Sequence, residues 1–103
     1  MLVTTTERIP GKEYEVIGIV SGNMIQSKHI GKDIGQGLKT VVGGELKTYT
    51  KMMSESRDIA TQRMIEEAES KGADAVVCTR FATSAIMGGA AEMVCYGTAV
   101  KFV

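Results

Sequence analysis

The stretch that decides the fold is ELKTYTKMMSESRDIATQRMIEEAESK, residues 45 to 71, which contains neither glycine nor proline. It is rich in Glu, Lys, Met, Arg and Ala, which are residues of high helix propensity. Lys71 places a cation in the expected last turn, and Gly72 is the residue type that most often ends a helix in a left-handed conformation. The stretch therefore predicts one long helix over about residues 45 to 71.

The apolar side chains of this predicted helix spread more widely than one contact surface requires. One stripe consists of Leu46, Tyr49, Met53, Ala60, Met64 and Ala68. A second set, Met52, Ile59 and Ile65, lies beside this stripe and widens it. A small sheet covers only one side of a helix, so the wide apolar surface predicts a second contact, made by another copy of the chain in a homo-oligomer.

The sequence before this helix has both strand and helix patterns. Residues 14 to 26, YEVIGIVSGNMIQ, predict a long strand, in which Gly18 and Gly22 suggest a bend or bulge. The β-branched start of the chain and the Pro10-Gly11 turn signal predict a hairpin with that strand. Residues 28 to 42 carry a helical apolar stripe interrupted by three glycines, which predicts a weak second helix.

The sequence after the long helix predicts a C-terminal hairpin. Residues 73 to 81 and 92 to 103 are strand-like, and residues 82 to 91, with Gly88-Gly89, are expected to connect them. Helices grouped between strands are typical of the α+β class, so we expect a mainly antiparallel sheet with the helices on one face. A chain of 103 residues is expected to form a single domain, residues 1 to 103.

Composition excludes several kinds of partner and site. Twelve basic and twelve acidic residues give a formal net charge of zero, so no global positive field favours nucleic acid or an anionic membrane. We find no run of about 18 apolar residues and no signal-peptide pattern, and therefore expect a cytoplasmic protein. Two cysteines that lack CxxC spacing do not form a disulfide scaffold.

An ordered set of short motifs resembles a known family. The set comprises Thr4-Thr5, Pro10-Gly11-Lys12, GIVSG at residues 18 to 22, Gly43-Gly44, the long charged helix, GADAV at residues 72 to 76 and GTAV at residues 97 to 100. In this order and length the chain resembles the YbjQ-like family, which is described as "putative heavy-metal-binding". The resemblance implies a ring-forming subunit of a homopentamer, and it implies no settled molecular function. The family pattern often carries acids where this chain has Ala82 and Ala85, which argues against an oxygen-ligand metal site there.

The two cysteines are the candidate metal ligands. If Phe81 faces Glu92 in the C-terminal hairpin, Cys78 faces Cys95, because opposed residues in an antiparallel pair share one sum of residue numbers. Two thiolates supply half of a tetrahedral soft-metal site, and the rest would come from Met87, Met93, His29 or another subunit. The alternative, which we favour, is that both are small buried apolar residues. We therefore expect reduced, metal-free and poorly reactive thiols.

A second candidate site is an anion or ligand site formed by Arg80, Thr83 and Ser84. A ring could bring several copies of the arginine together at the end of a strand and its loop. An exposed arginine beside a flexible turn is the commoner interpretation of such a pattern. The sequence indicates no nucleophile paired with a general base, so we assign no catalytic residues.

Two classes of function remain open at this point. The first, which we favour, is a non-catalytic oligomeric module that binds a small ligand or metal ion at subunit junctions. The second is a small enzyme, such as a hydrolase, that uses clefts between subunits; we lean against an enzyme and name no cofactor.

Overall fold

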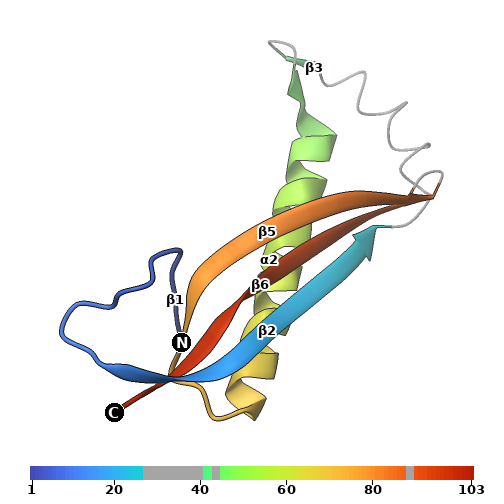
Figure 1. Ribbon diagram of the computed structural model, residues 1–103. Coiled ribbons are helices and arrows are strands. Elements are labelled where there is room, and N and C mark those ends of the chain that lie inside the picture. Colours follow the sequence, from blue (N-terminus) through green and yellow to red (C-terminus); the bar gives the residue numbers. More distant parts are fainter. Residues whose placement is uncertain (27–40, 43–44, 88–89) are drawn as a thin grey trace.

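A mixed four-stranded sheet is the frame of the protein (Figure 1). The computed structural model describes residues 1–26, 41–42, 45–87 and 90–103. Across the sheet the strands follow the order β1 (Leu2–Val3), β5 (Ala75–Met87), β6 (Ala90–Phe102) and β2 (Tyr14–Gln26). The β5–β6 and β6–β2 pairs are antiparallel, and β1 joins β5 in parallel. A separate antiparallel pair is formed by β3 (Val41–Val42) and β4 (Glu45–Leu46).

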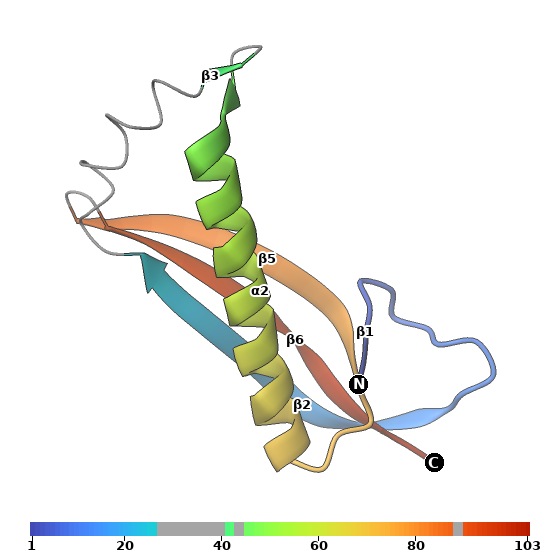
Figure 2. The same ribbon diagram turned by 180° about the vertical axis from the view of Figure 1, so that it is seen from behind.

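The long helix α2 (Lys47–Ser70) lies across one face of the sheet, as Figure 2 shows from behind. It confirms the helix predicted over residues 45 to 71, except that residues 45 and 46 belong to β4 and the helix ends at Ser70, one residue earlier than predicted. Gly72 follows with a φ of 77°, and its N–H donates to the Glu69 carbonyl at 3.0 Å. The N–H of Ala73 returns to the Ala68 carbonyl at 3.1 Å, so the last carbonyls of the helix are satisfied by its C-terminal turn.

The main core lies between α2 and the inner face of β2, β6 and β5. From the helix it takes Ala60, Met64 and Ala68; from the sheet it takes Val20, Val76, Met93, Cys95 and Ala99. Gly22 lies where the helix crosses β2, and a side chain there would meet the helix backbone at Ala60 and Met64. The absence of a side chain therefore allows the helix and the strand to pack with their backbones close together.

A smaller core lies on the opposite face of the sheet. Ala75, Val77 and Val100 are buried there beneath Ile9 and Tyr14, with Cys78 and Phe102 packed beside them. The segment between β1 and β2 therefore covers the lower part of this face. The predicted N-terminal hairpin is wrong, because β1 pairs with β5 and not with β2. Pairing between segments so distant in the chain leaves no local signal in the sequence.

The remaining predictions are confirmed in part. The strand over residues 14 to 26 is confirmed, with a bulge between Val16 and Gly18. The C-terminal hairpin is confirmed in type, but its strands continue through the predicted loop, so residues 82 to 87, 90 and 91 are strand. The weak helix predicted over residues 28 to 42 lies mostly outside the described residues, and its last two residues are strand β3. The α+β class is confirmed, and the sheet is mixed because of β1.

Helices that could span a membrane are absent from the part of the chain that the structure describes.

Candidate functional site

The two cysteines do not face each other. Strand β5 pairs with β6 so that Phe81 is opposite Cys95, and the register shifts between Val77 and Arg80. Cys78 lies in that shift with a φ of 55°, an unusual backbone conformation for a residue with a side chain. The expected pairing of Cys78 with Cys95 is therefore wrong, because it assumed that Phe81 faces Glu92, whereas Glu92 faces Ser84.

The two thiols also lie on opposite faces of the sheet. Cys95 belongs to the core under α2, and Cys78 packs against the smaller core on the other face. The sheet itself separates them, so the two sulfurs cannot share one metal ion within a chain. Both cysteines are free thiols.

Cys95 has the environment of a structural core residue. Its side chain is fully buried, with its sulfur 3.6 Å from the Met64 sulfur and 3.7 Å from the Thr61 hydroxyl. Burial raises the pKa of the Cys95 thiol, and the hydrogen bond from Thr61 only partly offsets that effect. The thiolate needed for metal ligation or nucleophilic attack is therefore disfavoured.

We expect the two thiols to react with a labelling reagent at different rates. Cys78 is partly exposed, whereas Cys95 is buried and stays protonated to a higher pH than an ordinary thiol. Titration with a chromogenic disulfide at pH 8 should label one thiol readily and the second only after denaturation. Cys78→Ser should abolish the fast phase and Cys95→Ser should leave it intact. Rapid labelling of both thiols in the folded protein would contradict the burial of Cys95.

The N-terminal segment is bound to β5 at the bulge. The N–H groups of Cys78 and Thr79 donate to the carbonyls of Thr6 and Thr4, at 3.2 and 3.0 Å. Arg80 adds a side-chain contact, since its Nη1 donates to the carbonyls of Thr5 at 3.1 Å and of Thr79 at 2.9 Å. The guanidinium therefore already fastens the N-terminal segment to the strand.

The predicted cluster of Arg80, Thr83 and Ser84 is spread along a strand instead of gathering in a loop. All three are exposed residues of β5, and they pair with Tyr96, Met93 and Glu92 in turn. Thr83 and Ser84 are consecutive, so their side chains point to opposite faces of the sheet. Within one chain Arg80 and Ser84 therefore share one face, and Thr83 lies on the other. An anion site built on them would need further groups from a second chain.

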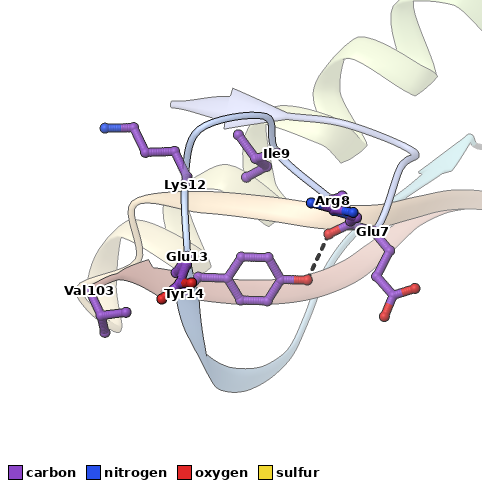
Figure 3. Close-up of a pocket in the computed structure, with 7 residues that line it drawn as sticks. All are labelled: Glu7, Arg8, Ile9, Lys12, Glu13, Tyr14 and Val103. Carbon is purple, nitrogen blue, oxygen red and sulfur yellow. Dashed lines mark hydrogen bonds between the residues drawn. The ribbon is translucent and has the colours of Figure 1, made fainter.

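An open cleft of about 380 Å³ lies at the lower end of the sheet (Figure 3). It is formed by residues 7 to 9 and 12 to 14 together with Val103. The Tyr14 hydroxyl donates to the Glu7 carbonyl at 2.7 Å and so holds the loop against the start of β2. The Lys12 ammonium lies 5.2 Å from the centre of the Phe102 ring, a cation–π contact at the cleft's edge.

The cleft carries both signs of charge and selects strongly for neither. Arg8 and Lys12 are matched by Glu7 and Glu13. The cleft is too open to bury a ligand on all sides. Sequence reasoning missed this cleft. The only available signal was the Pro10-Gly11-Lys12 turn, which predicted a loop without showing what packs against it.

A complete metal site is not formed within one chain by the residues that the structure describes. Across those residues, no three His, Cys, Asp or Glu side chains converge on a common point. His29, the one histidine of the sequence, lies outside the described residues. The described donor groups of a single chain therefore do not fit a heavy-metal ion.

Comparison with known proteins places the chain in a family. The family model YbjQ_1, described as "Putative heavy-metal-binding", matches residues 1–103. The chain belongs to the YbjQ family. This confirms the resemblance seen in the ordered motifs of the sequence.

Relatives of this YbjQ-family chain match over almost their whole length. A UPF0145 protein of Vibrio parahaemolyticus is 60% identical over 100% of this chain and 99% of its own. A UPF0145 protein of Clostridium novyi is 62% identical over 98% of both chains. The crystal structure of a DUF74-family protein from Pediococcus pentosaceus has a TM-score of 0.71 and 15% identity, and covers 100% of this chain and 98% of that one. The last comparison supports the fold alone.

Proposed function

We propose that this YbjQ-family chain is a cytoplasmic, non-catalytic subunit of a homo-oligomer that binds a small ligand or a metal ion at its subunit junctions. The observation that carries the proposal is the amount of large apolar side chain left exposed on a small sheet. Ile19 is 75% exposed, Val16 66% and Ile25 53%, and Phe81 and Ile86 are each about half exposed. So much exposed large apolar side chain on so small a sheet supports an interaction surface, of the kind that a neighbouring subunit would cover.

The shape of the chain supports the same proposal. The radius of gyration is 16.7 Å and the extents are 53 × 28 × 16 Å. A compact single domain of about 100 residues has a radius of gyration near 13 Å. The long strands and the helix therefore form a thin, extended unit, which has little interior of its own and which neighbouring subunits would complete.

Placing the ligand at subunit junctions follows from what one chain lacks. The described donor groups do not converge within one chain, so a metal ion of the kind in the family's description would take ligands from a second subunit or from residues such as His29 that lie outside the described part of the chain. Arg80, whose Nη1 is bound to the carbonyls of Thr5 and Thr79, has further guanidinium N–H groups that would serve an anionic ligand at a junction and not a metal ion. The resemblance to the family favours five subunits, and a ring would repeat each junction five times.

Native mass spectrometry of untagged protein, combined with elemental analysis, tests this proposal. We expect a mass several times the 11.0 kDa of one chain, with five copies favoured, and a retained ion or small molecule in a fixed ratio to subunits. A mass of one chain at micromolar concentration would refute the oligomer. An oligomer free of ligand after dialysis, which takes up neither Zn²⁺ nor Cu⁺ on addition, would refute the metal part of the proposal.

A further inference from the structure

Within the described residues, the outer edge of β5 is covered along only half of its length. The N–H of Thr4 donates to the Val76 carbonyl at 3.0 Å, and Cys78 and Thr79 donate back to the same N-terminal segment. From Arg80 to Met87 the described residues supply no strand on that side. Backbone N–H and C=O groups of alternate residues in a strand point to the same side. After Thr79, the residues whose backbone groups point away from β6 are therefore Phe81, Thr83 and Ala85. The upper half of this edge is therefore open to strand pairing.

β2 forms the other edge of the sheet, and there the upper half is the one that is covered. The Glu67 carboxylate accepts the Ser21 N–H at 3.2 Å, and Arg63 donates to the Asn23 carbonyl at 2.7 Å. Both side chains come from α2, and charged groups that occupy edge positions prevent another strand from adding there. Among the described residues nothing comparable covers residues 14 to 20. The lower half of the β2 edge is therefore the open one.

The two open halves are similar in length and in chemistry. Residues 80 to 87 of β5 are eight positions, and residues 14 to 20 of β2 are seven. Exposed apolar side chains accompany both, namely Phe81 and Ile86 on β5 and Val16, Ile17 and Ile19 on β2. An open edge beside exposed apolar side chains is a liability that folded proteins normally avoid unless the edge is paired.

We infer that the open half of β5 in one subunit pairs with the open half of β2 in the next, so that the sheet continues from subunit to subunit. This inference rests on the homo-oligomer of the proposed function and names its contact. A second copy of the chain is the occupant that the surface fits, because it supplies both open edges and a foreign strand would cover only one. The two edges lie on opposite sides of one sheet, so the contact is head-to-tail and can close into a ring. A formal net charge of zero places no overall repulsion between copies.

Charge placed beside either open edge tests the inference. Ile19→Glu and Phe81→Glu each put a carboxylate next to the added strand, at side chains that are 75% and 48% exposed in a single chain. Gln62→Glu adds the same charge on the exposed side of α2 and serves as the matched control. We expect both edge variants to sediment at about 11 kDa and the control to keep the wild-type mass. Circular dichroism should show all three folded, and Val16→Glu and Ile86→Glu repeat the test at independent positions.

Mixing the two edge variants separates a head-to-tail contact from a symmetric one. Ile19→Glu retains an intact β5 edge and Phe81→Glu an intact β2 edge, so together they should form one junction and stop at about 22 kDa, twice the 11.0 kDa of the chain. Edge variants that keep the wild-type mass would overturn the inference and leave the homo-oligomer standing. So would an Ile19→Glu variant that assembles normally while Phe81→Glu does not. A wild-type protein of 11 kDa would refute the oligomer as well.

Discussion

Gly22→Val is expected to lower the free energy of unfolding by about 3 kcal/mol, near the upper end of the usual cost of overpacking a core. The first side-chain atom at this position would collide with backbone atoms of α2 at Ala60, Arg63 and Met64. A side chain can rotate away from a collision, but a helix backbone cannot, so α2 would have to lift from β2. That movement would open the core around Met64 and Val20.

Urea denaturation at a fixed protein concentration measures this effect, because assembly contributes to apparent stability. The matched control is Ser21→Val, which adds the same side chain at the neighbouring exposed position and leaves the backbone bond to Glu67 in place. The control should change stability by no more than about 0.5 kcal/mol. Equal midpoints for the two variants would show that α2 does not pack on β2 at Gly22.

Met64→Ala is expected to cost about 2–5 kcal/mol, the range for truncating a large buried side chain. Met64 is fully buried at the centre of α2 and contacts Cys95 through its sulfur. Its truncation would leave a cavity between the helix and the sheet, lined by residues of both. Because Met64 covers the Cys95 thiol, the same variant should also speed the labelling of that thiol.

Met64→Leu is the control, since a swap that conserves volume usually costs under about 1.5 kcal/mol. Denaturation midpoints for the three proteins give the comparison, with thiol titration as a second readout. The described core would be wrong if Met64→Ala were as stable as Met64→Leu and its Cys95 remained as slow to label as in the wild type.

The parts of the fold that the sequence predicted are those fixed by neighbouring residues. The helix lacks glycine and proline over its length and ends at Ser70, two residues before Gly72, so its existence and its end are both predictable from neighbouring residues. The strand over residues 14 to 26 alternates in burial and is rich in β-branched residues in its first half. The sequence predicts a loop at the tip of the C-terminal hairpin because the alanines there have low strand propensity, which pairing between β5 and β6 overrides.

The candidate site was harder to predict because it depends on register and on distant contacts. The two thiols are not opposed because the hairpin register is three positions away from the assumed one, and the bulge at Cys78 lies between the two parts of the ladder. The edge of β2 is covered by hydrogen bonds between Glu67 and Ser21 and between Arg63 and Asn23. In the sequence, Glu67 and Arg63 look like ordinary solvent-exposed charges of a helix. The partly unpaired edges of β5 and β2 depend on the strand order, and no local sequence pattern determines which strand lies at the edge of a sheet.

The parallel pairing of β1 with β5 has a consequence for how the chain is made. Leu2 and Val3 are synthesised well before their partners Ala75 and Val76, which lie more than seventy residues further along the chain. At roughly 5–20 residues per second, the first strand waits several seconds or longer for its place in the sheet. The β2–β6 and β5–β6 pairs also require the last strand to be synthesised. The nascent chain therefore has no main sheet to join until β6 has been synthesised, and α2 and the short β3–β4 pair are the described elements whose contacts are local enough to form before then.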